Sequence, residues 1–417
     1  MKLTSILRIW LTRSFKSFEF KDVYSKSLDY ENLETLGLYV HIPFCETICS
    51  FCPYCKEVYD KDKSKVYKAA LLREIDLVGK NLTNKKRVTS LYFGGGTPAL
   101  MIEDLGDIIK KISEYFIIED GIGVELRLKD VTIDNLEKLK SIGVNMISIG
   151  VQSFNEACLD ALGREKTDYS NIQSILNKVF FDSVDMDLIF AIPNQTKESL
   201  KEDIDRAFSY GATQISTYPF IDFTFANNKY KPLDECYKKD MLNFIGEYSR
   251  KINLERTSVW TFAKKNSKKY SSITRDNFLG FGTSATTLLK NQFKINSFSI
   301  DGYVDRIHRG ELPTSLTLDF TLRQRMVYYL FWASYSMKID KNGFYNLFGY
   351  SIKKYFGFPI YLGKIFGLLE EEGDVLNLTD KGAYYYHYIE QAYTTAYIDK
   401  MWNISRKIPF PKKIVLK

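Results

Sequence analysis

Several hallmarks of membrane-bound and repetitive proteins are missing from this sequence of 417 residues. No run reaches the roughly 18 apolar residues that a membrane-spanning helix requires, and basic residues between Lys2 and Lys16 interrupt the apolar core that a secretory signal would need. The sequence also has no internal repeat beyond a strand–helix alternation, and no low-complexity tract. We therefore expect a globular, cytoplasmic protein without a transmembrane segment.

A strong excess of charge of one sign is also absent. The net charge is only +7, and the charged residues are scattered except in a basic segment, RKIPFPKKIVLK at 406–417. A weak positive bias is compatible with an anionic ligand, but it does not by itself indicate binding to nucleic acid. We expect no nucleic-acid partner, and we expect the basic segment to be a solvated tail.

Histidine is scarce, with 3 residues, and the 6 cysteines are unevenly placed, because four of them lie between Cys45 and Cys55. A disulfide framework would distribute its cysteines through a small secreted chain. Dense clustering in a long chain indicates a metal site instead. Cys158 and Cys236 are isolated, and we expect them to be ordinary structural residues.

Strand and helix patterns alternate between residues 36 and 230. Amphipathic helices are predicted between six apolar strands, which are LGLYVHI (36–42), RVTSLYF (87–93), VELRL (124–128), NMISIGV (145–151), VDMDLIF (184–190) and TQISTYPF (213–220). Such a series predicts a parallel sheet with right-handed crossovers. The unusual residues follow the strands, where barrel enzymes place their chemistry. The predicted fold class is α/β, a partial (β/α)6 TIM-type barrel with a small C-terminal helical, winged-helix-like domain.

The predicted organisation has five parts. An N-terminal arm (1–35) precedes the partial barrel (36–230), and a barrel extension with covering strands (231–315) follows. A small helical domain (316–390) includes LEEEGDVLNLTDKG, a segment typical of a β-wing, and a basic tail (391–417) comes last. Because the helices of the small domain lack a cluster of basic residues, we predict a lid or packing module.

The segment CETICSFC places Cys45, Cys49 and Cys52 at the spacing C-x3-C-x2-C. Thiolates are the usual ligands of iron–sulfur clusters, and three of them leave one iron of a [4Fe–4S] cube without a protein ligand. An open metal position is where a cofactor or substrate binds. Structural zinc usually requires a second ligand pair, which the sequence lacks. Cys55 leaves an alternative open, because CPYC (52–55) has the spacing of a redox pair or a zinc knuckle.

Three glycines follow the second predicted strand directly, in YFGGGTPA (92–99). Glycine allows backbone N–H groups to approach a bound carboxylate or phosphate closely. The segment is neither a P-loop nor a dinucleotide fingerprint, because the Lys-Ser/Thr pair and the G-x-G-x-x-G spacing are absent. It predicts a binding loop near the cysteines.

The order of the motifs along the chain resembles a known family. YVHIPFCxxxCxxC, GGGTP, VNMISIGVQSF, LGRE, DLIFAIPNQT and FLGFGTSA are similar to motifs of the oxygen-independent coproporphyrinogen III oxidase family of radical S-adenosylmethionine (SAM) proteins. That family also includes heme chaperones and class C methyltransferases. The resemblance implies a [4Fe–4S] cluster on Cys45, Cys49 and Cys52, and one or two bound SAM molecules.

The resemblance also implies which residues contact SAM. By motif position they are Tyr39, Gly96, Thr97, Glu125, Gln152, Arg164 and Asp187, together with Ile221 and Thr286, whose side chains match the family poorly. Further implications are reductive cleavage of SAM to a 5′-deoxyadenosyl radical and an electron donor such as flavodoxin or ferredoxin. The substrate would be a flat, anionic small molecule, in the family a tetrapyrrole.

Three departures from the family pattern leave the reaction open. Tyr54 stands where the oxidases carry a further cysteine, Arg127 follows Glu125 where the family often has Asn-Pro or Asp-Pro, and Ala191-Ile192-Pro193 replaces Gly-Leu-Pro. Because Arg127 shares a face of the strand with Glu125, we expect it to pair with that carboxylate or to reach a substrate carboxylate. The open functions are oxidative decarboxylation, methyl transfer, a heme-binding chaperone that keeps the cluster, and a zinc or redox protein built on CPYC.

Overall fold

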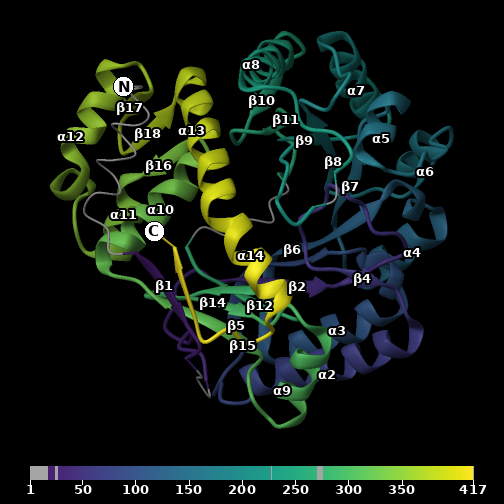
Figure 1. Ribbon diagram of the computed structural model, residues 1–417, viewed down its shortest axis with the longest axis vertical. Coiled ribbons are helices and arrows are strands. Elements are labelled where there is room, and N and C mark those ends of the chain that lie inside the picture. The colour runs from purple at the N-terminus through teal and green to yellow at the C-terminus, as the bar shows by residue number, and fades with distance from the viewer. Residues whose placement is uncertain (1–16, 24–26, 227, 270–275, 417) are drawn as a thin grey trace.

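The computed structural model describes residues 17–23, 27–226, 228–269 and 276–416. The six predicted strands are all present, hydrogen-bonded in parallel to one another in chain order, and form the centre of a larger sheet (Figure 1). They are β2 (Gly37–Ile42), β5 (Lys86–Gly95), β6 (Phe116–Arg127), β7 (Met146–Gln152), β8 (Ser183–Phe190) and β9 (Gln214–Pro219). The predicted fold class, a partial TIM-type barrel, is confirmed.

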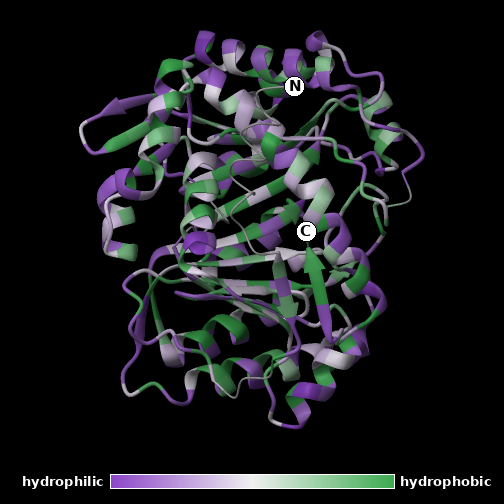
Figure 2. Ribbon diagram, turned by 60° about the vertical axis from the view of Figure 1, so that its left-hand side comes forward, coloured by the Kyte–Doolittle hydropathy of each residue, from purple (hydrophilic) through white to green (hydrophobic). Residues whose placement is uncertain are grey.

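Helices connect these strands. They are α2 (Lys61–Gly79), α3 (Ile102–Tyr115), α4 (Ile133–Ser141), α5 (Glu156–Leu162), α6 (Ile172–Lys178) and α7 (Lys197–Ser209). Thr196 accepts a hydrogen bond from the Ser199 backbone N–H, which satisfies a donor that the helix itself leaves unpaired. Figure 2 shows hydrophilic and hydrophobic residues alternating along the outer helices, as expected for helices that cover a sheet with one face.

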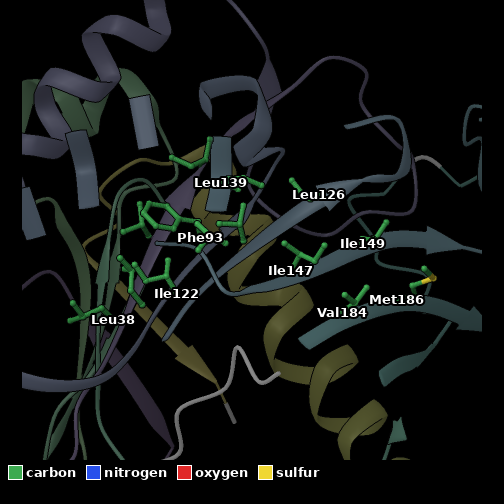
Figure 3. Close-up of a cluster of buried hydrophobic side chains, with 14 of the residues drawn as sticks. Leu38, Phe93, Ile122, Leu126, Leu139, Ile147, Ile149, Val184 and Met186 are labelled. Carbon is green, nitrogen blue, oxygen red and sulfur yellow. The ribbon is translucent and has the colours of Figure 1, made fainter. Parts of the chain in front are cut away.

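Alternation along the strands separates the core from the barrel interior. On β7 and β8, Ile147, Ile149, Val184 and Met186 are buried in the main core, and Figure 3 draws them in one apolar cluster. The intervening residues therefore point to the opposite face, because successive side chains of a strand alternate. Each fully buried aliphatic side chain contributes about 1.5–3 kcal/mol, so this pattern fixes which residues face the barrel interior.

Further strands extend the sheet on both sides of the barrel. Beyond β9 lie the antiparallel strands β11 (Thr261–Lys264) and β10 (Leu254–Arg256). Beyond β2 lie β12 (Phe278–Phe281), β13 (Thr286–Leu288), β14 (Gln292–Asn296), β15 (Thr314–Asp319), β1 (Phe18–Lys21) and β19 (Lys413–Leu416). The helices of this region are α8 (Glu235–Lys251) and α9 (Ile300–His308), and two short strands, β3 (Phe44–Cys45) and β4 (Glu57–Val58), pair with each other near the cysteines.

A small unit combines helices with a three-stranded sheet of order β16-β18-β17. Its elements are α10 (Leu322–Tyr335), β16 (Lys338–Asp340), α11 (Lys341–Phe348), α12 (Ile352–Ile365), β17 (Leu369–Glu372), β18 (Val375–Leu378) and α13 (Asp380–Tyr393). The β17–β18 hairpin lies where the sequence predicts a β-wing. In Figure 1 the long helix α13 runs between this unit and the barrel strands.

The basic segment is not a solvated tail. After α13 a π-helical turn (Thr394–Ile398) leads into α14 (Asp399–Lys407), and β19 then pairs antiparallel with β1 at the edge of the main sheet. Ile414 and Leu416 are each 3% exposed and pack with Phe20. Apolar residues alternate with the lysines and make this segment a strand. The basic charge, on which the prediction of a solvated tail rested, did not indicate this. Of the predicted arm, residues 1–16 lie outside the described residues.

No helix in the described part of the chain is both long and apolar enough to cross a membrane.

Candidate active site

A cavity of about 1660 Å³ opens at the C-terminal ends of the parallel strands. Every residue that the sequence predicts for cluster or SAM binding lines it: Tyr39, Cys45, Cys49, Cys52, Gly96, Thr97, Glu125, Gln152, Arg164, Asp187, Ile221 and Thr286. The cavity exceeds the roughly 300–1,000 Å³ of common small-molecule pockets. It therefore has room for a large ligand beside a cofactor.

The three predicted cluster ligands lie on one loop after β2. Cys45 ends the short strand β3, and Cys49 and Cys52 follow it in a turn, all three partly exposed. Hydrogen-bond donors face two of the sulfurs, since Thr97 Oγ1 lies 3.8 Å from Cys45 Sγ and Arg164 Nη1 lies 3.8 Å from Cys49 Sγ. Such donors stabilise negative charge on sulfur. Burial raises the pKa of the Cys45 thiol to about 11, so metal binding is what would deprotonate it.

These residues fit a cluster better than a single ion. Among the described residues, no three His, Cys, Asp or Glu side chains lie close enough together to hold one metal ion. In an iron–sulfur cube each cysteine binds a different iron, so the ligand sulfurs stand apart around the cluster. A structural zinc would require four donors around one point. The loop thus suits the open cube that the spacing predicts.

Two glycines of GGGTP bring the binding loop against the cysteine loop. A Cβ on Gly95, whose φ is +113°, would lie 2.4 Å from the His41 ring, and a Cβ on Gly96 would lie 2.5 Å from the Phe44 carbonyl oxygen. The Gly96 N–H donates to Ile42 O at 2.7 Å, and the Thr97 N–H donates to Phe44 O at 2.7 Å. Only glycine permits this approach, so the loop is fixed against the segment that leads into Cys45.

Glu125 points from β6 into the cavity and is held by two donors. Tyr92 Oη donates to Oε1 at 2.8 Å, and the Gly95 N–H donates to Oε2 at 3.1 Å. Burial raises the pKa of Glu125, although both hydrogen bonds oppose that shift. Next to it, the Tyr39 and Tyr92 rings stack with centroids 6.1 Å apart, and Tyr39 Oη lies 2.9 Å from His41 Nδ1.

A β-bulge at the end of β7 presents the next two predicted residues. The register with β8 shifts between Gly150 and Gln152, and Gln152 adopts a left-handed φ of 71°. Such strain is typical of positions where a bulge redirects a side chain. Arg164 Nη2 donates to Gly150 O at 2.6 Å, so the bulge also anchors the arginine that faces Cys49.

Asp187 lies on β8 and faces the same space. Its Oδ2 accepts a hydrogen bond from Ser148 Oγ at 3.0 Å. Burial, with the neighbouring carboxylates of Asp185 and Glu125, raises the pKa of Asp187 well above its ordinary value. A ligand that brings donors or positive charge would therefore be favoured here.

Ile221 and Thr286 line the cavity after β9 and at the start of β13.

Arg127 differs from one of our expectations, because it does not pair with Glu125. Its guanidinium binds Asp130, with Nη2 2.7 Å from Oδ1, and Glu46 of the cysteine loop, with Nη1 2.8 Å from Oε2. Its acidic partners thus lie outside β6, and the alternation of residues along that strand could not predict them.

Sequence reasoning did not locate the aromatic wall of the cavity. Aromatic side chains from covering strands and C-terminal helices form it: Phe298, Tyr328, Phe331, Trp332, Tyr335, Tyr393, Tyr397 and Trp402. The sequence signal for it is the aromatic content of 15%, which does not indicate where in the fold the aromatic residues lie. The cavity thus has two kinds of lining, a polar barrel end suited to a cofactor and an aromatic wall suited to a flat ligand.

Comparisons with known proteins agree with this geometry. The sequence pattern of the radical SAM superfamily matches residues 39–207. The chain is 26% identical over 309 residues to an oxygen-independent coproporphyrinogen III oxidase of Cereibacter sphaeroides, covering 67% of this chain and 68% of that protein. It is 26% identical over 307 residues to the heme chaperone HemW of Bacillus subtilis, covering 69% and 80%.

A solved structure shares the fold. Coproporphyrinogen III oxidase (HemN) from Escherichia coli, described as a radical SAM enzyme, superposes with a TM-score of 0.75 at 22% identity, covering 92% of this chain and 98% of that one. The likeness extends beyond the barrel to the C-terminal helical unit. Residues 39–207 thus match the radical SAM superfamily, whose members use a [4Fe–4S] cluster and SAM, and the chain is similar to both the oxygen-independent coproporphyrinogen III oxidases and the heme chaperones.

Proposed function

We propose that this chain is a radical SAM enzyme that acts on a large, flat substrate of the tetrapyrrole class. The observation that carries the proposal is the shared cavity, which is lined by the cysteine loop, the predicted SAM contacts and an aromatic wall. A cofactor alone would not require that volume. The volume and the aromatic lining suit a macrocycle placed beside SAM.

In this proposal Cys45, Cys49 and Cys52 hold the cluster, and the residues around Glu125 and Asp187 hold SAM. When bound, the pair supplies a 5′-deoxyadenosyl radical that takes hydrogen from the substrate. The chain's own residues orient the ligands and exclude water. Thr97 and Arg164 stabilise the sulfurs, and the glycine loop keeps the cysteines in register with the SAM contacts.

The aromatic wall supports the choice of substrate class. Phe331 packs against Tyr386 and Tyr393 with ring centroids 5.1 and 5.2 Å away, so the wall is built from interlocked rings rather than flexible chains. Rigid aromatic faces favour flat ligands. Lys338 lines the cavity as well and is suited to a carboxylate of an anionic substrate, whereas Lys269 of the same lining is paired with Glu255.

The decisive experiment is performed without oxygen. Protein reconstituted with iron and sulfide is mixed with SAM and dithionite, with and without coproporphyrinogen III, and 5′-deoxyadenosine and tetrapyrrole products are quantified. We expect 5′-deoxyadenosine to form and to increase with substrate. S-adenosylhomocysteine beside it would assign methyl transfer, and loss of carboxyl groups would assign oxidative decarboxylation.

A heme chaperone is the second candidate, because the same aromatic cavity suits heme and the similarity covers 80% of the Bacillus subtilis chaperone. A cluster-loaded protein that binds hemin but forms no 5′-deoxyadenosine with any tetrapyrrole would favour the chaperone and contradict the enzyme.

A further inference from the structure

We infer that Asp185 forms a second polar subsite in the cavity, which accepts a hydrogen bond from a nitrogen donor of the bound ligand, either an N–H or an ammonium group. The inference deepens the proposed function and rests on it for the identity of the ligand. Asp185 has no counterpart among the positions that the family resemblance predicts for SAM or cluster binding.

The strand period places Asp185 beside the predicted SAM contacts. It precedes Asp187 by two residues on β8, so both carboxylates point to the same face, with Asp185 further from the C-terminal edge. Asp185 lines the cavity although its side chain is almost fully enclosed, with only 2% of the residue exposed. It therefore lies one inward-facing position below Asp187, level in strand register with Ser148 and Glu125.

The two oxygens of Asp185 are in different situations. Oδ2 accepts hydrogen bonds from Ser216 Oγ at 2.6 Å and from Gln214 Nε2 at 3.0 Å. Oδ1 is buried and has no hydrogen-bond partner among the described residues. A buried acceptor without a donor is costly, and such groups in native proteins generally find a partner. The missing partner is a hydrogen-bond donor, and the cavity is where it can come from.

The surroundings select the kind of donor. Ser258 and Thr261 line the same part of the cavity, and Ser258 Oγ donates to Thr261 Oγ1 at 2.8 Å. Asp187 adds a second carboxyl group, so a carboxylate of the ligand would be repelled. Trp260 and Tyr218 flank the site as an edge-to-face pair with ring centroids 5.9 Å apart. A hydrogen-bond acceptor in a cavity that is also lined by aromatic rings suits a flat ring that carries an N–H.

Two ligands of the proposed reaction carry such donors. The pyrrole rings of a porphyrinogen have N–H groups, and SAM has amino groups on its adenine and methionine parts. The chemistry that Asp185 recognises is the same in both cases. An experiment that titrates each ligand separately tells them apart.

The test is Asp185→Asn in cluster-loaded protein, studied by anaerobic calorimetry with SAM and with coproporphyrinogen III. Asparagine keeps an oxygen for Ser216 and Gln214 and places an NH2 group at the Oδ1 position, so volume is conserved while the acceptor becomes a donor. We expect the affinity for one ligand to fall at least tenfold while the other changes less than twofold. A fall for porphyrinogen assigns the donor to the substrate, and a fall for SAM assigns it to SAM.

A matched control is Asp203→Asn. Asp203 is 1% exposed, but it lies outside the cavity lining, and both of its oxygens are bonded, to Ser153 Oγ at 2.6 Å and to the Phe154 N–H at 2.7 Å. This variant measures how far the loss of a buried carboxylate outside the cavity changes ligand affinity. Equal affinities of wild type and Asp185→Asn for every ligand that the wild type binds would overturn the inference, as would equal losses in the two variants. Wild type that binds SAM but no porphyrinogen would refute the substrate class alone, and the SAM titration would then decide for or against the subsite.

Discussion

Arg406 of α14 donates a hydrogen bond to the carbonyl oxygen of Pro53 in the cysteine loop, although 353 residues separate the two. The guanidinium also lies over the rings of Phe225 and Phe298, at 4.5 and 5.6 Å from their centroids. One turn earlier, Trp402 packs against Tyr54 at 6.1 Å. The last helix of the described chain thus holds the outer side of the loop that carries Cys52.

Replacing Arg406 should therefore loosen the cluster without removing a ligand. In Arg406→Ala the Pro53 carbonyl loses its donor and the two aromatic rings lose a cation–π partner. We expect reconstituted protein to retain less than half of the wild-type iron after anaerobic gel filtration with a chelator. Lys407→Ala, which changes the exposed neighbouring residue, should match wild type. Equal iron retention in both variants would contradict a positioning role.

Cys55 should be dispensable for the cluster. It is 6% exposed, its thiol donates to Phe298 O at 3.2 Å, and burial raises its pKa to about 11, so it stays a protonated structural thiol. Cys55→Ala is expected to keep iron content near that of wild type, whereas Cys49→Ala should lose the cluster. The check is iron and sulfide analysis with the visible absorption of the cluster. Complete loss of iron in Cys55→Ala would restore the CPYC zinc or redox interpretation.

Gly96→Ala should damage both stability and SAM binding. The new Cβ would lie 2.5 Å from a backbone oxygen that cannot rotate away, so the glycine loop must shift from the cysteine loop. Overpacking of this kind costs about 1–3 kcal/mol, measurable by denaturant unfolding, and we expect SAM affinity to fall at least tenfold.

The control for that substitution is Gly357→Ala in α12. The nearest atom to its Cβ position is 3.9 Å away, so alanine fits without displacement. It should leave SAM affinity and the free energy of unfolding close to those of wild type, because Gly357 follows the kink of α12 at Phe356 and gains no helix-interior preference from alanine. If Gly96→Ala behaves in the same way, the close approach of the two loops is not needed.

His387 should make stability depend on pH. It is fully buried, Trp260 Nε1 donates to its Nδ1 at 3.1 Å, and its pKa falls to about 3, first through burial and then through Lys238 and Arg256. Because the unfolded chain protonates near 6.5, the stability that neutral His387 provides is full above pH 6.5 and is lost as pH falls toward 3.

Between pH 7 and pH 5 this residue should lower the free energy of unfolding by about 2 kcal/mol. His387→Gln should remove that part of the pH dependence, as measured by urea unfolding at both values. The same loss between pH 7 and pH 5 in the variant would show that other groups cause it.

The barrel was predictable because each strand carries its own signal. In β8, for example, Val184 and Met186 alternate with Asp185 and Asp187, so one segment reveals both the strand and the polar inner face. The cysteine loop and the glycine loop follow strands directly, and parallel strands bring such loops to one edge. Local periodicity and topology therefore sufficed for the polar half of the site.

The aromatic half was not predictable in the same way. Arg406 and Trp402 reach the cysteine loop only because β19 pairs with β1 and directs α14 across the cavity, and no local pattern encodes that pairing. Arg127 gives a second example, since its partner Glu46 lies 81 residues away. Contacts between segments far apart in sequence depend on how the whole chain packs.

The position of α14 has a consequence for assembly in the cell. A ribosome makes the cysteine loop first and adds the 353 residues that lead to Arg406 afterwards, which at about 5–20 residues per second takes tens of seconds. Throughout that interval the outer side of the loop is uncovered. The loop that carries Cys52 therefore gains the cover of Arg406 and Trp402 only after the last helix of the described chain has been made.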